Sequence, residues 1–384
     1  MDFGLSDEQR LLQKTARDFV ARTCPPSVAK EWDEAGTYPT ALFRGMAEQG
    51  WFSLPFPESA GGADGSIVEL CLLAEELGRA SLDIAMCYAG TFIPGLTLYK
   101  WGSPAQHERY LPGLMAGTSR FAIAMSEPDV GSDVAALRTS AVDTGDDHFL
   151  VNGQKAWCTG AGLPGTVIAM YVRTDPDAPK HSGLSLLLVD PDTPGIEIRR
   201  TPTLARHILG TNEVFLHDVR VPKDNLVGPL HGGWEVLLSG LDVEKILMSA
   251  AYVGTAQATL DEALEYAKLR TAFGRPIGNF QAISHALADL QTEIDAARLL
   301  SQRAAWLLAN GHSCTREGAM AKLKGSETYV EAARWGMQIL AGHGFSTESV
   351  MSFRWRESIV ATISGGTSQI QRNAIARSMG LRSY

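Results

Sequence analysis

The chain has 384 residues, which is enough for one large unit or two to three sub-domains around a real hydrophobic core. Hydrophobic residues make up 45% and charged residues 20%, as in ordinary globular proteins, and the net charge of −9 argues against a nucleic-acid surface. No stretch approaches the roughly 20 apolar residues of a membrane span, and the acidic N-terminus is unlike a signal or transit peptide. Five scattered cysteines without a Cys-x-x-Cys pair predict a cytoplasmic protein with no metal site.

Residues 1–119 are predicted to form an N-terminal α-helical domain. Ser6-Asp7-Glu8-Gln9 has the pattern of a capping box, and apolar residues follow it at helical spacing. The loop at 55–66 is rich in glycine and proline and separates further helices, of which Ile67–Leu77 has a clear apolar period.

Residues 120–228 are predicted to form a middle β domain. Short β-branched or alternating runs such as TVIAMYV and LSLLLVD are bounded there by glycine, proline and aspartate. Asn152-Gly153 between apolar flanks predicts a hairpin turn. We expect a compact antiparallel β-barrel or sandwich.

Residues 229–384 are predicted to form a C-terminal four-helix bundle, which makes the whole chain an α+β protein. Only one of the 18 prolines, Pro276, lies beyond Pro229, and long windows are rich in strong helix formers. The predicted helices are 233–268, 280–309, 315–341 and 366–380. No Gly-x-Gly-x-x-Gly follows a strand, so a Rossmann nucleotide site is unsupported.

The run Ile363–Arg372, ISGGTSQIQR, resembles the C-terminal signature of the acyl-CoA dehydrogenase flavoprotein family. Other segments resemble the family in the same order, namely AMSEP at 124–128 with GSD at 131–133, WCT at 157–159, DVRVP at 218–222 and RTAFG at 270–274. The resemblance spans essentially the whole chain. It implies the family's three-domain fold, an FAD cofactor and an acyl-CoA thioester substrate.

The resemblance also implies roles for individual side chains. Small hydroxyls at strand ends suit the polar edge of a flavin, an indole offers a flat face, and a guanidinium can pair with a pyrophosphate. Each such residue alone has an ordinary structural explanation, for example a helix N-cap for Thr367. The implied cofactor-binding residues are Met125, Ser126, Trp157, Thr159, Arg270, Phe273, Gln281, Gln338, Gly342, Thr367 and Gln369. The implied substrate-binding residues are Ser132, Leu241, Asp242, Lys245, Ser364, Gly366 and Arg377.

One catalytic residue of the family signature is absent. Many members carry a glutamate where this chain has Gly365, which cannot act as a base. A carboxylate in a dry pocket suits that task, because desolvation raises its pKa toward the working pH. Leu237, Leu241, Glu244 and Met248 step by four, three and four, so Glu244 lies on an apolar helix face.

Two observations weigh on Glu244. A glutamate in the middle of a helix is usually solvated, and the neighbouring Lys245 is compatible with that interpretation. The context Gly240–Lys245, however, resembles the isovaleryl- and long-chain-type enzymes, whose base lies on this helix and whose C-terminal run lacks the glutamate. We therefore expect Glu244 to be the base. Lys245 stands where that context has arginine, and Ser364 stands where many relatives have an aromatic residue.

The resemblance predicts FAD-dependent α,β-dehydrogenation of an acyl-CoA to the trans-2-enoyl-CoA. Glu244 would take the α-proton, FAD N5 the hydride, and the N–H of Gly365 would help polarise the thioester. It further implies electron transfer to an electron-transfer flavoprotein and a homotetramer built as a dimer of dimers. The alternatives are a carrier-protein thioester as substrate, an enoyl-CoA reductase, an oxygen-using flavoenzyme, and a flavin- or acyl-CoA-binding protein without turnover.

Overall fold

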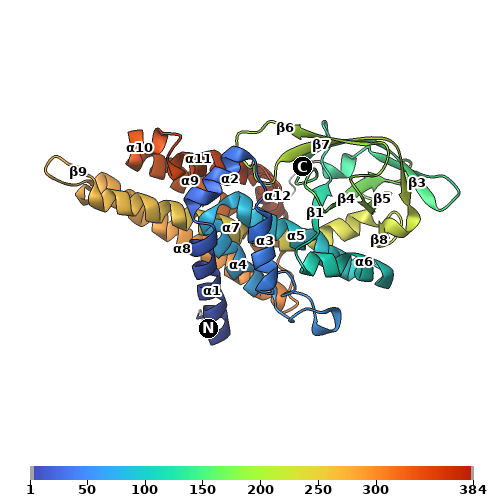
Figure 1. Ribbon diagram of the computed structural model, residues 1–384, viewed down its shortest axis with the longest axis horizontal. Coiled ribbons are helices and arrows are strands. Elements are labelled where there is room, and N and C mark those ends of the chain that lie inside the picture. Colours follow the sequence, from blue (N-terminus) through green and yellow to red (C-terminus); the bar gives the residue numbers. More distant parts are fainter. Residues whose placement is uncertain (1–3, 382–384) are drawn as a thin grey trace.

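The computed structural model describes residues 4–381. Figure 1 shows a β domain at one end of an elongated molecule and long helices that extend from it to the other end. Among residues 4–381, no helix is long and apolar enough to cross a membrane. The five cysteines, which lie in all three parts of the chain, are buried free thiols.

The N-terminal domain is helical, as predicted. The expected capping box begins its first helix, because the Ser6 hydroxyl accepts from the Gln9 N–H at 3.2 Å and the Gln9 side chain accepts from the Ser6 N–H at 3.0 Å. A second capping box at Ser66 and Glu69 begins the helix predicted from Ile67. The helices are α1 (Asp7–Thr23), α2 (Pro26–Ala35), α3 (Thr40–Glu48), α4 (Ile67–Ala80), α5 (Leu82–Trp101) and α6 (Pro104–Met115).

The middle domain contains one eight-stranded sheet in the order β6-β7-β3-β2-β4-β5-β8, with β1 beside β4. Most neighbours are antiparallel, as predicted, but β1 and β2 both pair with β4 in the parallel direction. The strands are β1 (Arg120–Ala124), β2 (Ser140–Asp143), β3 (His148–Thr159), β4 (Thr166–Arg173), β5 (Leu184–Val189), β6 (Ile196–Thr201), β7 (Thr211–Pro222) and β8 (Leu226–Val227).

The prediction of a hairpin turn at Asn152-Gly153 was wrong. Strand β3 continues through both residues, and the pairing register with β7 shifts between Val151 and Gly153, which marks a β-bulge. The Asn152 amide oxygen accepts from the Asp218 N–H at 2.9 Å, and its amide group donates to the Asp218 carboxylate at 3.0 Å. The Asn152 side chain is therefore bonded to the neighbouring strand β7 and not within a turn.

The C-terminal domain contains the four predicted helices with small shifts at their ends. Two shorter helices between the third and the fourth, α10 and α11, were not predicted. The helices are α7 (Gly233–Leu269), α8 (Gln281–Ala309), α9 (Thr315–Leu340), α10 (Gly342–Phe345), α11 (Val350–Ser358) and α12 (Ser368–Ser378). A small hairpin of β9 (Thr271–Ala272) and β10 (Arg275–Pro276) joins α7 to α8.

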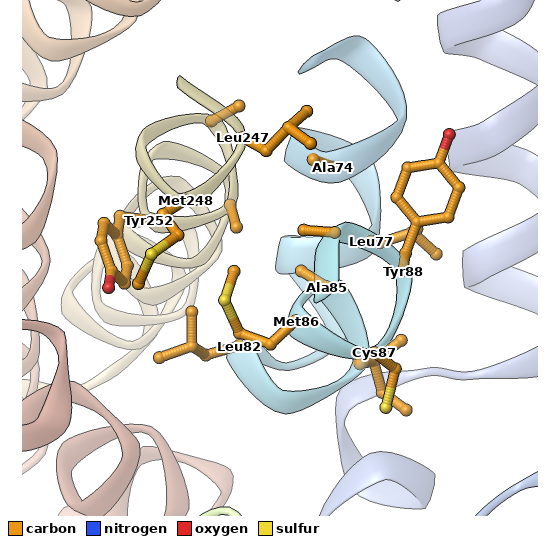
Figure 2. Close-up of a cluster of buried hydrophobic side chains, with 14 of the residues drawn as sticks. Ala74, Leu77, Leu82, Ala85, Met86, Cys87, Tyr88, Leu247, Met248 and Tyr252 are labelled. Carbon is orange, nitrogen blue, oxygen red and sulfur yellow. The ribbon is translucent and has the colours of Figure 1, made fainter. Parts of the chain in front are cut away.

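Close contact between α4 and α7 fixes the central helix of the molecule. A β-carbon on Gly254 would lie 1.8 Å from the Glu75 carbonyl oxygen, and one on Gly78 would lie 2.4 Å from the Ala251 carbonyl oxygen. The two backbones can approach this closely only because glycine stands at both crossing points. Figure 2 shows Ala74 and Leu77 facing Leu247 in the adjoining core.

A buried ionic cluster joins the three domains. Asp33 on α2 accepts from the His207 N–H at 2.8 Å, and Asp83 on α5 pairs with Arg206 at 3.2 Å, both partners being in the loop before β7. Glu357 on α11 accepts from the Ser81 hydroxyl at 2.8 Å at the start of α5. The three carboxylates are 0% exposed. We call Asp33, Asp83, Arg206, His207, Arg356 and Glu357 the three-domain cluster; Arg356 lies 3.6 Å from Asp33.

Candidate active site

Glu244 and Gly365 lie face to face. Gly365 has φ +61°, and a β-carbon built on it would lie 3.3 Å from Oε1 of Glu244. The carboxylate of Glu244 therefore stands where a side chain at position 365 would project. The structure therefore brings the two predicted catalytic positions, Glu244 and Gly365, together.

The Glu244 side chain borders a small cavity between the helices and the sheet. The cavity holds about 20 Å³, room for about one water molecule. Met125 at the end of β1 and Leu241 on α7, both predicted site residues, lie in its wall. The other lining residues come from α5, β1, β4, β5 and α7 and are mainly apolar: Ile93, Pro94, Thr97, Ile123, Ala169, Tyr171, Leu186, Leu237 and Gly240.

The environment of Glu244 changes its acidity. Its side chain is only half-buried because it borders the cavity, yet protein surrounds it deeply enough that desolvation raises the pKa of its carboxyl group. The positive charges of Lys245 and Lys322 oppose this rise. A carboxylate with a raised pKa in an apolar pocket can accept a proton from a weakly acidic carbon.

The loop that carries Gly365 is held by two side chains that the sequence analysis missed. The ammonium of Lys322 on α9, which is 0% exposed, donates to the carbonyl oxygens of Gly366 at 2.7 Å and Ala361 at 3.1 Å. The amide of Gln371 on α12 donates to the carbonyl oxygens of Gly365 and Gly366, both at 3.1 Å. Burial lowers the pKa of Lys322 to about 8.

Asp242 and Lys245 form a pair on the same turn of α7 as Glu244. The Lys245 ammonium donates to the Asp242 carboxylate at 3.1 Å, and the Thr315 hydroxyl at the start of α9 donates to the same carboxylate at 2.8 Å. Both predicted substrate residues are partly buried. The pair therefore ties α7 to α9 close to Glu244.

Ser364 and Gly366 flank Gly365. The Ser364 hydroxyl donates to the Val360 carbonyl oxygen at 3.3 Å and lies near the buried hydroxyl of Tyr252 on α7. Ser364 therefore lies between the C-terminal loop and α7.

Four predicted cofactor residues meet at the ends of β1 and β3. The Ala156 N–H donates to the Ser126 carbonyl oxygen at 2.9 Å, which places Ser126 beside Trp157. Trp157 has φ +61° and an indole that is 62% exposed, while Thr159 ends the strand. The buried Lys155 donates to the Met125 carbonyl oxygen at 3.3 Å. An exposed aromatic plane beside small polar groups fits a flat ring system such as a flavin.

Five predicted cofactor residues lie far from Glu244. Arg270, Phe273 and Gln281 are exposed around the β9–β10 hairpin, and Gln338 and Gly342 are exposed where α9 meets α10. Tyr266 and His343, whose ring centroids are 5.7 Å apart, link these two segments. We call residues 266–281 and 338–345 the tip. Figure 1 places it at the end of the molecule opposite the sheet.

The remaining predictions have mixed outcomes. Thr367 is the N-cap of α12, where its hydroxyl accepts from the Ile370 N–H at 3.2 Å, so its ordinary structural role is present. Gln369 is exposed on the first turn of α12, and Arg377 is exposed on the last turn. Ser132 is exposed in the loop after β1 and is not part of the cavity wall.

The fold and the site define an α–β–α oxidoreductase with a half-buried glutamate at a domain junction. The N-terminal, middle and C-terminal domains of acyl-CoA dehydrogenases match residues 6–118, 122–219 and 231–380. The chain belongs to the acyl-CoA dehydrogenase family of flavoprotein oxidoreductases.

Named relatives differ in their reactions. The chain is 37% identical to a probable acyl-CoA dehydrogenase, YngJ, of Bacillus subtilis, over 99% of this chain and 100% of that protein. It is 34% identical to the caffeyl-CoA reductase-Etf complex subunit CarC of Acetobacterium woodii, over 97% and 98%. A glutaryl-coenzyme A dehydrogenase in complex with glutaryl-CoA has a TM-score of 0.95 at 33% identity, over 100% and 98%. An FAD complex of PigA has a TM-score of 0.94 at 28% identity, over 100% of both chains.

Proposed function

We propose that the protein oxidises an acyl-CoA thioester to the trans-2-enoyl-CoA, with Glu244 as the base. The observation that carries this proposal is the 3.3 Å approach between Glu244 Oε1 and the position that a side chain at residue 365 would take. The Glu244 carboxylate belongs to α7. It occupies the position at which the family signature places a glutamate side chain from the C-terminal loop. The proposed base therefore comes from a different helix but acts at the same position beside the substrate.

The reaction divides the two hydrogens between the protein and the cofactor. Glu244 takes the proton from the α-carbon, and the electron pair of that bond forms the new double bond. FAD, when bound, accepts the hydride that leaves the β-carbon. The N–H of Gly365 would donate to the thioester oxygen and so stabilise the negative charge that develops there. Lys322 and Gln371 would keep this N–H in place, since they hold the carbonyl groups of its own loop.

The residues support an FAD site that two chains share. Trp157, Ser126 and Thr159 would hold the flavin ring on the sheet side, and Met125 would lie between that ring and the cavity. The tip of another copy would supply Arg270, Phe273 and Gln281, because within one chain these residues lie at the opposite end. The 95% exposure of Phe273 and the 82% exposure of Phe345 support burial against a second copy. A homotetramer built as a dimer of dimers meets this requirement.

The same geometry permits the reverse reaction, because an acid that returns a proton to the α-carbon occupies the place of the base. CarC, named as a reductase subunit in a complex with an electron-transfer flavoprotein, supports this second candidate. We propose an electron-transfer flavoprotein as the partner in either direction. Supplying reduced flavoprotein and an enoyl-CoA, or oxidised flavoprotein and an acyl-CoA, separates the two directions by initial rates.

The test of the base is the Glu244→Gln variant under anaerobic conditions. We expect it to retain flavin and ligand binding, while bleaching of the flavin by acyl-CoA slows by about 10²- to 10⁴-fold or more. Glu265→Gln, on the exposed face of the same helix, is the matched control and should bleach normally. Normal bleaching by Glu244→Gln would exclude Glu244 as the base. A protein that binds FAD but is bleached by no acyl thioester, including carrier-linked ones, would favour a binding protein without turnover.

A further inference from the structure

Helices α5 and α7 form two walls of the cavity beside Glu244, and we call the strip between these two helices the groove. A β-carbon on Gly240 would lie 3.0 Å from the Thr97 hydroxyl, so this end of α5 lies beside the first turns of α7. In the opposite direction, Figure 2 shows Leu82 and Met86 of α5 pointing across to the turns of α7 that carry Met248 and Tyr252. The two helices therefore run antiparallel, and the groove continues from the cavity toward Met86.

That continuation is closed by side chains. Met86, Met248, Leu82 and Tyr252 are at most 7% exposed and belong to one buried hydrophobic cluster. Met248 lies one turn beyond Glu244, and its sulfur would be 2.4 Å from a β-carbon on Gly365. The thioether therefore packs directly against the glycine that faces the base. An acyl chain whose α-carbon is at Glu244 meets this cluster within a short distance.

The room before the cluster can be judged from α5. Met86, Gly90, Pro94 and Thr97 follow one another on one helix face, and a β-carbon on Gly90 would meet nothing within 4 Å. Gly90 is one turn from Pro94, which is about 5–6 Å, or about four carbon–carbon bonds. The open part of the groove therefore extends about one helical turn from Pro94, which lines the cavity together with Glu244.

The cavity wall also limits the charge of an acyl group. Of the described residues that line it, Glu244 is the one with a charged side chain, and its charge is negative. A terminal carboxylate on the acyl chain would enter an apolar space with no cation among the described residues of its wall, at a large desolvation cost. The surroundings favour a hydrocarbon end.

We propose that Met86 and Met248 close the acyl site and restrict the substrate to short, uncharged acyl groups of about four to six carbons, as the one-turn length of the groove indicates. This inference rests on the proposed function, since it places the acyl group beside Glu244. Methionine suits a closing position of this kind, because it is flexible and fills irregular gaps.

The first measurement compares thioesters on the FAD-loaded protein. Butyryl-, hexanoyl-, octanoyl-, dodecanoyl- and glutaryl-CoA are assayed for kcat/KM with an artificial electron acceptor. We expect kcat/KM to fall by about 10-fold or more between butyryl- and octanoyl-CoA, because the extra methylenes meet a closed wall. Glutaryl-CoA should be a poorer substrate still. Equal turnover of butyryl- and dodecanoyl-CoA, or a preference for glutaryl-CoA, would overturn the proposal.

The second measurement uses Met86→Ala and Met248→Ala. Either change should raise the ratio of octanoyl- to butyryl-CoA kcat/KM by about 10-fold, since each additional methylene that finds room contributes about four-fold. Met46→Ala is the matched control, because Met46 is equally buried but lies on α3 away from the groove. The control should lose stability while keeping the wild-type ratio. An unchanged ratio in both groove variants would overturn the assignment of these residues.

Measurements of acyl-CoA binding test the length limit independently of the proposed reaction. In Glu244→Gln, the Kd of each acyl-CoA is read from the change in flavin absorbance. Tight binding of butyryl- but weak binding of octanoyl-CoA, reversed by adding Met86→Ala, supports the length limit even if the wild-type protein dehydrogenates nothing. If no acyl-CoA of any length binds, both the length limit and the proposed function are wrong.

Discussion

The Glu244 pocket and the tip differ in almost every physical respect. At Glu244, side chains from α5, the sheet and α7 of one chain converge on a cavity of about 20 Å³. At the tip, an aromatic residue that is 95% exposed stands on a short hairpin with polar neighbours. The Glu244 pocket is lined by side chains of a single chain, whereas the groups of the tip are exposed to solvent. If the proposed function holds, the proton is taken within one copy, while residues of two copies hold the cofactor.

Mixing two inactive variants would test this division most strongly. Glu244→Gln lacks the base but keeps its tip, and Arg270→Ala keeps the base but weakens the tip. If sites are shared across pairs of chains, refolding an equal mixture restores about one quarter of wild-type activity, because half of the pairs are mixed and one of their two sites is intact. Activity is measured by anaerobic bleaching per chain, with FAD in excess. A mixture as inactive as its components would show that each chain builds its site alone.

Gly365→Ala tests how tightly the Glu244 pocket is closed. The added β-carbon would lie 2.4 Å from the Met248 sulfur and 3.3 Å from Glu244 Oε1, at a backbone conformation that disfavours alanine. We expect bleaching to slow by about 10- to 100-fold, since small misplacements at a reacting centre are costly. Gly311→Ala has a similar φ of +72° in open space between α8 and α9, so it controls for strain alone. Equal effects of the two changes would mean that the contact with Glu244 is unimportant.

Lys322→Met tests the electrostatics of the same pocket. Glu244 acts as a base only when ionised, so kcat/KM should rise with pH through the pKa of Glu244. The Lys322 ammonium lowers that pKa, and its removal should therefore displace the rising limb to higher pH and reduce the rate at pH 7 by about 10-fold. Lys324→Met, a change at the pair with Glu293, should leave the profile in place. A limb that does not move while the rate falls would assign Lys322 a purely structural role.

Gly153→Ala should have the smallest effect, because the β3 bulge lies outside both regions. A β-carbon there would lie 2.8 Å from the Thr139 hydroxyl at φ +147°, so we expect a loss of about 1–3 kcal/mol in stability. The thermal midpoint should fall, and bleaching per bound flavin should stay normal. Gly145→Ala, at φ +81° in open space, should cost less. A bleaching defect in Gly153→Ala would mean that this part of the sheet also supports the geometry of the Glu244 pocket.

The fold could be predicted where local signals agree with the tertiary structure. Long helices such as α7 and α8 follow from composition and period alone. Helix α11 was not predicted, because its buried face includes Arg354 and Glu357, and charged residues are typical of exposed segments. The bulge at Asn152-Gly153 was mistaken for a turn, because its stabilising partner, Asp218, is 66 residues away in the chain.

The sequence indicated the residues proposed to carry out the chemistry, but it did not indicate the residues that hold them in place. The spacing of Leu237, Leu241 and Glu244 placed Glu244 on an apolar helix face, but the resemblance of Gly240–Lys245 to the isovaleryl- and long-chain-type enzymes was needed to propose it as the base opposite Gly365. Lys322 and Gln371 were missed because both bind backbone carbonyl groups, which have no signature in the sequence. The available signal for Lys322 is its place on a face of α9 that carries Gly318 and Gly325, both buried small residues.

The three-domain cluster has a consequence for attempts to produce the domains separately or to exchange them among relatives. Removing the β domain would leave Asp33 and Asp83 without His207 and Arg206, and separating the two helical domains would leave Glu357 without Ser81. Burial with the nearby Asp83 charge already raises the pKa of Glu357 to about 8. A fragment cut at a domain border would lose these pairs, so we expect chimeras among relatives to need all six cluster residues together.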